Sequence, residues 1–286
     1  MNTKSTYLAI TMLLALSGGA FAEPRAKLGD NAALRYWAAF AEMQDWATTP
    51  ENAKELRAIL DGTAPYDDLK YKDLVAKNEP ALRLMQRGTT IPNCDWGLDY
   101  DLGPDTPVEY VRNALQLGRL NVLYAFHQMI NGDKDGGLRT LAAGMHFAHD
   151  VATGGSLFAT LVAKDLLESH FQAAEFAIHA GISSEQVAVL RKAVAQFGPE
   201  GLDWESAIRL EMAARNRPPW QKNVSLARVT QAYVNALKNP ATLPEFERLL
   251  GTIPMPLHDV IPPPQRTLEE KQEFERKLQQ AKAALE

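Results

Sequence analysis

The stretch that decides the fold is GLRTLAAGMHFAHDVATGGSLFATLVAKDLLESHFQAAEFAIHA, residues 137–180. It holds two segments whose apolar residues recur every three or four positions, the period of a helix with one buried face. The turn Thr153-Gly154-Gly155 separates them. Because this turn is short, we expect the two helices to run antiparallel and to pack together. The apolar arcs are Leu141, Met145, Ala148 and Ala152 on the first helix, and Ala163, Leu166, Leu167, Phe171, Ala174 and Ile178 on the second.

The helical period continues on both sides of this hairpin, with almost no two-residue alternation of the kind that predicts strands. Capping patterns mark several helix starts: Thr106 with Glu109, Ser183 with Gln186, and Thr267 with Glu270. We therefore predict an all-α fold, an irregular array of antiparallel helical hairpins. Residues 107–197 are tetratricopeptide-like, although the consensus of that repeat is not met. The predicted helices cover about 31–45, 50–60, 67–87, 107–130, 137–152, 156–180, 184–197, 203–215, 223–238, 243–250 and 267–285.

Residues 1–22 have the pattern of a signal peptide: Lys4, an apolar run from Tyr7 to Leu16, and small residues at Ala20 and Ala22. The alternative is a core helix or a membrane anchor, but the apolar run is too short to span a bilayer. We expect cleavage after Ala22, export to a periplasmic or extracellular space, and no membrane insertion after cleavage. The remaining chain divides into a helical array (23–250), a proline-rich connector (251–266) and a C-terminal helix (267–286).

The C-terminal helix has a narrow apolar stripe made of Phe274, Leu278, Ala281 and Leu285. A lone helix of this length is only marginally stable in water, so something should cover the stripe. Docking onto the chain's own helices is the favoured interpretation. Packing against another chain and a frayed tail are the alternatives.

Composition limits the possible functions. The chain has 286 residues and a formal net charge of −5, which argues against a dedicated nucleic-acid binder. Its single cysteine, Cys94, excludes an internal disulfide framework. We favour a buried Cys94 beside Trp96 over pairing between chains. The expected state is a monomer or a weakly associating chain.

Two segments carry a resemblance: NAALRYWAAF at residues 31–40 and CDWGLD at residues 94–99. Together with the long helix and the Gly-Asp turn that follow, they resemble a group of uncharacterised secreted α-helical bacterial proteins. The resemblance implies a helical fold and an exported location. It implies no catalytic residues, because the group has no assigned activity.

Two acidic loops are candidates for binding. In the first, Asp99 and Asp101 could offer oxygens to a hard cation, and Trp96 and Tyr100 could line a binding surface. The simpler interpretation is a solvated loop that its aromatic residues pin to the core. In the second, Asn131, Asp133 and Asp135 match the start of a calcium loop. Ala142 stands where the closing glutamate should be, so we expect a polar turn without calcium.

The histidines give the remaining candidates. His170 lies on the apolar arc of its helix, where a hydrogen-bonded core histidine is the favoured interpretation. Counting outward from the 153–155 turn puts His170 level with about residue 139, some 10 Å along the axis from His146. That register argues against a zinc site shared by His146, His149 and His170. His127 lies at a similar level to His170, and Glu168 is near it in sequence.

We therefore expect a secreted or periplasmic α-helical binding or scaffold protein that is not an enzyme, whose partner is another protein rather than nucleic acid, and which needs no cofactor or metal. The alternative is an extracytoplasmic hydrolase or metal-dependent enzyme that uses a buried cluster of His170, His127 and Glu168. The usual nucleophile, metal and nucleotide motifs are missing from the sequence.

Overall fold

The computed structural model describes residues 29–44, 50–100, 102, 108–215, 225–253 and 261–286. The chain divides into two units, Met1–Asp30 and Asn31–Glu286, and the fold described below is that of the second. The predicted signal peptide, Asp101, Thr106 and residues 254–260 of the predicted connector lie outside the described residues.

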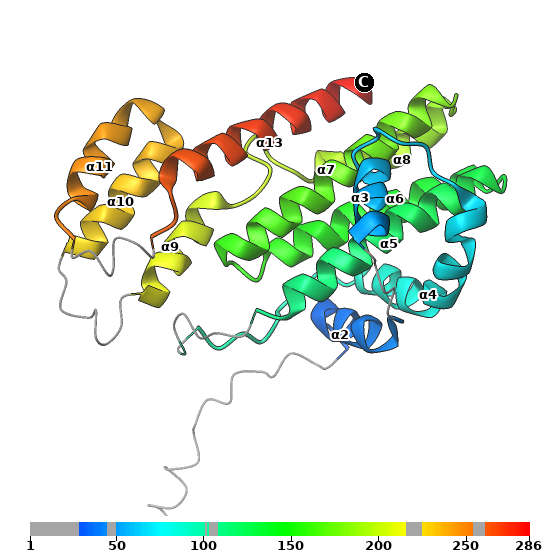
Figure 1. Ribbon diagram of the computed structural model, residues 1–286, viewed down its shortest axis with the longest axis horizontal. Helices are drawn as coiled ribbons and strands as arrows, with labels where there is room; N and C mark the ends of the chain where they lie inside the picture. The colour runs from blue at the N-terminus through cyan, green and yellow to red at the C-terminus, as the bar shows by residue number, and fades with distance from the viewer. Residues whose placement is uncertain (1–28, 45–49, 101, 103–107, 216–224, 254–260) are drawn as a thin grey trace, which may run out of the picture. The chain divides into compact units, whose positions relative to one another are not determined.

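All regular structure in the described residues is helical, as predicted (Figure 1). No helix among them combines the length and the apolarity that a membrane span requires. The α-helices are α2 (Ala32–Glu42), α3 (Pro50–Leu60), α4 (Asp68–Gly88), α5 (Tyr110–Ile130), α6 (Lys134–Ala152), α7 (Leu157–His179), α8 (Ser184–Ala195), α9 (Trp204–Arg215), α10 (Ser225–Lys238), α11 (Leu243–Leu250) and α13 (Pro264–Ala284).

Helices α5, α6 and α7 pack on one another and form the centre of the unit. Thr140 of α6 joins the two helices, since its carbonyl accepts from Asn121 of α5 at 2.8 Å and its hydroxyl donates to Gln128 of α5 at 2.7 Å. Ser156 begins α7, where its hydroxyl accepts a hydrogen bond from the Ala159 N–H. The antiparallel hairpin predicted from residues 137–180 is therefore present, with both apolar arcs in the core.

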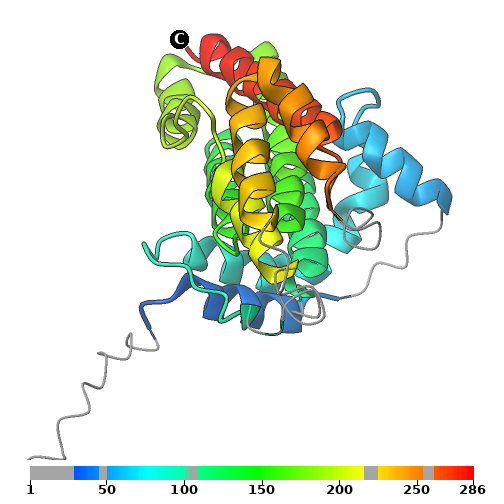
Figure 2. The ribbon, with the colours of Figure 1, turned by 90° about the vertical axis from the view of Figure 1, so that its left-hand side faces the viewer.

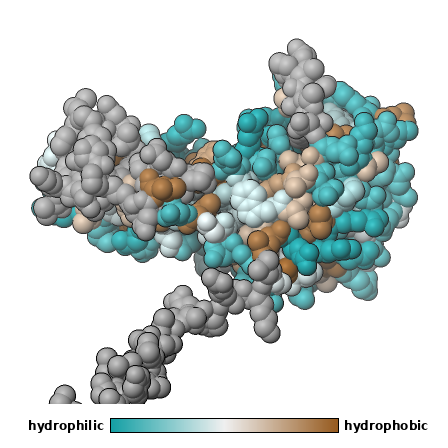
Figure 3. Space-filling model, turned by 90° about the horizontal axis from the view of Figure 1, so that it is seen from below, coloured by the Kyte–Doolittle hydropathy of each residue, from teal (hydrophilic) through white to brown (hydrophobic). Residues whose placement is uncertain are grey.

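The outer helices cover this centre. Helix α4 packs on α5 and α2, α8 packs on α6, and α10 packs on α9 and α11. The face seen in Figure 3 is mostly hydrophilic, with separate apolar patches. Leu34 and Trp37 of α2 are among the exposed apolar side chains. The capping box of Ser183 and Gln186 is confirmed at the start of α8.

The C-terminal helix docks on the chain's own helices, which is the favoured of the three predicted outcomes. Helix α13 packs on α7, α8 and α10 (Figures 1 and 2). Phe274 and Leu278 are fully buried, and the Phe274 ring stacks on Phe171 of α7 at 6.4 Å between centroids. The apolar stripe is therefore covered within one chain.

The predicted start of α13 is wrong by three residues. The helix begins at Pro264, not at Thr267, because proline fixes a helical φ at the first position and needs no hydrogen bond there. The Thr267 hydroxyl donates to the Pro263 carbonyl at 3.2 Å and accepts from the Tyr233 hydroxyl at 2.9 Å. Thr267 thus joins α13 to α10 and does not act as a helix cap.

Candidate functional site

His170 is a fully buried core residue of α7. Its Nδ1–H donates to the Leu166 carbonyl at 2.7 Å, which leaves Nε2 as an acceptor. The amide Nδ2–H of Asn121, on α5, donates to Nε2 at 3.1 Å. Burial lowers the pKa of His170 to about 4, so the imidazole is neutral at pH 7. His170 is therefore a hydrogen-bonded core histidine, as the favoured interpretation predicted.

The register of the hairpin differs from the one expected by counting. The imidazole of His170 lies against Gly144, where any Cβ would overlap His170 Nε2 and Asn121 Nδ2, and not against residue 139. Helical side chains lean toward the N-terminus of their own helix, which brings His170 back toward the turn. A side chain at position 144 would fill the space that the ring needs. Gly144 and Asn121, which the sequence analysis did not single out, thus complete this core site.

His127 and Glu168 do not converge on His170, which corrects the predicted cluster. His127 is partly exposed, and its Nδ1 lies 2.6 Å from Asp68 of α4. Asn131 also hydrogen-bonds that carboxylate. Partial burial opposes ionisation of Asp68, but these hydrogen bonds outweigh it and lower the pKa of the carboxyl. Glu168 lies two residues from His170, on a different face of α7.

Glu168 is instead an ion-pair bridge between α7 and α13. Its carboxylate lies 3.1 Å from Lys164 of its own helix and 2.8 Å from Lys277 of α13. Lys164, whose side chain is only 7% exposed, also pairs with Glu270 of α13 at 2.9 Å. In the described part of the chain, no group of three or more histidine, cysteine, aspartate or glutamate side chains is arranged to hold a metal ion.

The acidic loop is fixed to the core rather than open for binding. Trp96 is buried, stacks on Tyr110 at 4.1 Å, and donates from Nε1 to the Asp150 carbonyl at 2.8 Å. It is therefore part of the core, and not of a binding surface as suggested above. Cys94 is a half-buried free thiol, and burial raises its pKa to about 12. Tyr100 is half-buried and Asp99 is exposed.

The two segments that carry the family resemblance meet at this loop. Asn31, at the start of α2, donates to the Asp95 carbonyl at 2.7 Å and accepts from the Asp95 N–H at 2.9 Å. Tyr36 of α2 stacks on Trp96. These contacts give both segments a structural role.

The second acidic loop is a turn built from its own side chains. Asp133 caps α6 by accepting from the Gly136 N–H at 2.8 Å. Asn131 donates to the His127 carbonyl, and Asp135 accepts from Gln186 of α8. Gly132 takes a positive φ of 92°, which favours glycine. These oxygens bond to the protein itself, which agrees with the predicted polar turn.

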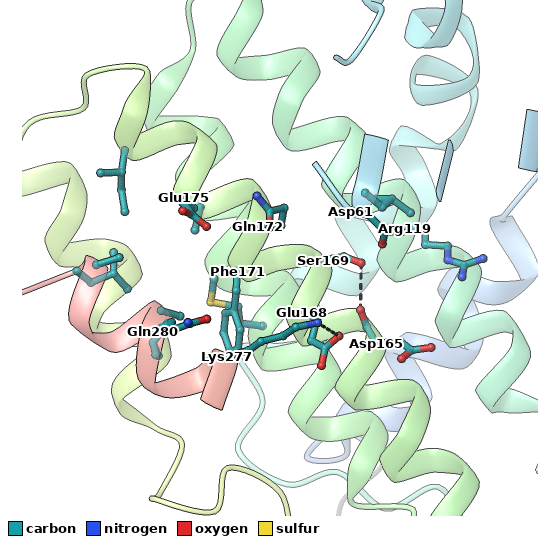
Figure 4. A pocket seen from close by; sticks show the side chains of 18 of the residues that line it. Asp61, Arg119, Asp165, Glu168, Ser169, Phe171, Gln172, Glu175, Lys277 and Gln280 are labelled. Atoms are coloured by element: carbon teal, nitrogen blue, oxygen red, sulfur yellow. Dashed lines mark hydrogen bonds and ion pairs between the residues drawn. The ribbon is translucent and has the colours of Figure 1, made fainter. Parts of the chain in front are cut away.

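A pocket of about 650 Å³ opens between α3, α5, α7, α8 and α13 (Figure 4). It lies on the exposed side of α7, away from His170. Phe171 and Ala174 of α7 and Ala281 of α13 are apolar lining residues. The charged and polar residues that line it are Arg57, Asp61, Arg119, Asp165, Glu168, Ser169, Gln172, Glu175, Lys277 and Gln280.

Most charges in this pocket are paired inside the protein. Arg57 pairs with Asp61 at 3.6 Å, and Asp165 pairs with Lys164 at 3.5 Å. Lys277 pairs with Glu168, as described above. Two charged side chains remain: Arg119 and Glu175 make no side-chain hydrogen bond or ion pair with any described residue.

Arg119 is the less expected of the two, because its guanidinium is only partly exposed. Burial lowers its pKa below the ordinary value, while the more distant Asp165 and Asp61 oppose that shift. Sequence reasoning missed this residue. Its signal is a lone cation within Leu117-Gly118-Arg119-Leu120, an otherwise apolar turn of a buried helix.

Comparisons of the chain with protein-family models, curated proteins and solved structures find no significant match.

Proposed function

We propose that the chain is an exported, non-enzymatic binding protein, and that its ligand occupies the pocket between α3, α5, α7, α8 and α13. The observation that supports this most strongly is Arg119, a partly buried cation that lines the pocket and makes no hydrogen bond or ion pair with a described residue. Removing a charge from water without pairing it destabilises a fold. A ligand that brings an anion offsets that penalty, so the arrangement suits a bound state.

The size of the pocket also supports this function. Clefts that hold small molecules have volumes of about 300–1,000 Å³, and this pocket has about 650 Å³. Its walls are packed helices, from which both apolar and polar side chains line the space. We therefore propose a ligand small enough to enter the pocket, in place of the broad surface of a protein partner.

Native mass spectrometry of the protein purified from its exporting host tests the proposal. We expect a bound molecule on the wild-type chain and none on Ser169→Trp, whose indole would fill the pocket. Ser206→Trp, at an exposed serine of α9, is the matched control and should keep the bound molecule. The proposal is wrong if no molecule is bound and if a panel of small carboxylates, amines and short peptides leaves the melting temperature unchanged.

One observation favours a second candidate, hydrolysis at His127. Asp68 holds Nδ1 of this imidazole at 2.6 Å, as an orienting carboxylate does in acid–base catalysis. Nε2 makes no hydrogen bond with any described residue. Turnover of p-nitrophenyl acetate that disappears in His127→Gln, but not in the exposed control His149→Gln, would support hydrolysis. The binding proposal expects the same background rate in all three proteins.

A further inference from the structure

Two charged side chains that line the pocket, Arg119 and Glu175, make no ion pair with a described residue, and they lie at separate positions. Figure 4 shows Arg119 at one end, beside Asp61, and Glu175 toward the other end, with Gln172 between them. Building on the proposed function, we propose that the ligand is a short peptide of about three residues with free ends. Its carboxylate binds Arg119 and its ammonium group binds Glu175.

The Arg119 end suits a carboxylate. A guanidinium offers two parallel N–H groups that match the two oxygens of a carboxylate, and such paired hydrogen bonds are strong when partly shielded from water. Asp61 and Asp165 act on Arg119 only beyond ion-pair distance, and each pairs with another cation. The guanidinium is therefore available to an incoming anion.

The Glu175 end suits an ammonium group. Glu175 is an exposed residue whose carboxylate makes no ion pair with a described residue, and His179, one turn away, donates to its backbone carbonyl instead. Ser169 and Glu175 of α7 both line the pocket, and the separation of six residues between them corresponds to about 9 Å along the helix axis. An extended chain spans roughly 3.3 Å per residue, so three residues bridge this distance.

The middle of the pocket suits a peptide backbone with an apolar side chain. Gln172 offers an amide that makes no side-chain hydrogen bond with a described residue, so it can both donate to and accept from a peptide group. Gln280 accepts from Arg276 at 2.9 Å through its oxygen, which leaves its NH₂ group as a donor. Phe171 and Ala174 supply the apolar wall.

This arrangement discriminates against simpler ligands. A single amino acid is too short to reach both ends. A dicarboxylate would place its second anion beside Glu175, and a diamine would place a cation beside Arg119. Each of these would add repulsion where a peptide gains attraction.

Calorimetric titration with Ala-Leu-Ala tests the inference. We expect the free peptide to bind, and its C-terminal amide and N-acetyl forms to bind roughly tenfold or more weakly, since each lacks one charge contact. Arg119→Gln should remove the difference between acid and amide. Glu175→Gln should remove the difference between amine and acetyl forms. The exposed controls Arg112→Gln and Glu245→Gln should keep both differences.

The outcomes separate this inference from the proposed function. If a molecule is bound in the pocket by native mass spectrometry but Ala-Leu-Ala does not compete with it, the peptide assignment is wrong and the binding function stands. If Ala-Leu-Ala binds with equal affinity in its free, amidated and acetylated forms, the assigned roles of Arg119 and Glu175 are overturned. If neither a bound molecule nor peptide binding is found, both proposals fail.

Discussion

The His170 site and the pocket that Arg119 of α5 lines lie against two faces of the same helix, α7. They differ in how the hydrogen-bonding and charged groups at each place are paired. At the His170 site both ring nitrogens have a partner supplied by the chain itself, although the buried Oδ1 of Asn121 accepts no hydrogen bond from a described residue. In the pocket, the half-buried Arg119 makes no hydrogen bond or ion pair with a described residue, although neighbouring charges are paired. Burial with internal partners is characteristic of a structural site, and partial burial without them is characteristic of a site that awaits a ligand.

This comparison predicts that His170 makes stability depend on pH. The pKa of His170 is about 4 in the fold, against 6.5 for an unperturbed histidine. Between these values the unfolded chain binds a proton that the folded chain does not. The free energy of unfolding should therefore fall as pH decreases from 6.5 to 4, by about 3 kcal/mol. NMR titration of the imidazole, expected to remain neutral at pH 5, checks the assignment directly. Protonation of His170 in the folded protein at pH 6 would contradict it.

A methyl group at Gly144 should disrupt the same core site. Alanine favours a helix over glycine, yet the added Cβ would overlap His170 Nε2 and Asn121 Nδ2. We expect Gly144→Ala to lower the free energy of unfolding by about 2 kcal/mol, measured by urea denaturation. Gly198→Ala, where a Cβ meets no atom within 4 Å, is the control. A Gly144→Ala protein as stable as the wild type would show that the site is not tightly packed.

The ion-pair bridge at the edge of the pocket should show a smaller effect. Glu168→Gln leaves Lys277 without one partner and weakens the hold of α13 on α7. We expect a loss of about 1–2 kcal/mol, because the Glu168 side chain is only 16% exposed. Glu273→Gln removes an exposed pair with Arg276 and a 3.5 Å surface pair with Lys277 while Glu168 stays in place, and it should change stability by less than about 0.5 kcal/mol. Equal effects of the two substitutions would indicate that Glu168 is not a structural bridge.

The His170 site was more predictable from sequence than the pocket, for a physical reason. Helical periodicity shows which face of a helix is buried, so it identified His170 as a core residue. It does not show which residues of other helices lie opposite, and Asn121 and Gly144 were missed for that reason. The pocket joins residues from Arg57 of α3 to Leu285, just after α13. Lys277 contacts Glu168 only because α13 docks on helices of its own chain. The sequence left open whether it would do so.

Arg119→Gln, measured for both stability and binding, tests most directly the claim that Arg119 serves a ligand and not the fold. The account predicts a urea midpoint equal to or above that of the wild type, since no described residue loses a hydrogen bond or ion pair and a partly buried, unpaired charge is removed. It also predicts that affinity for Ala-Leu-Ala falls roughly tenfold or more. A clearly destabilised variant, or one that binds the peptide as tightly as the wild type, would contradict the claim.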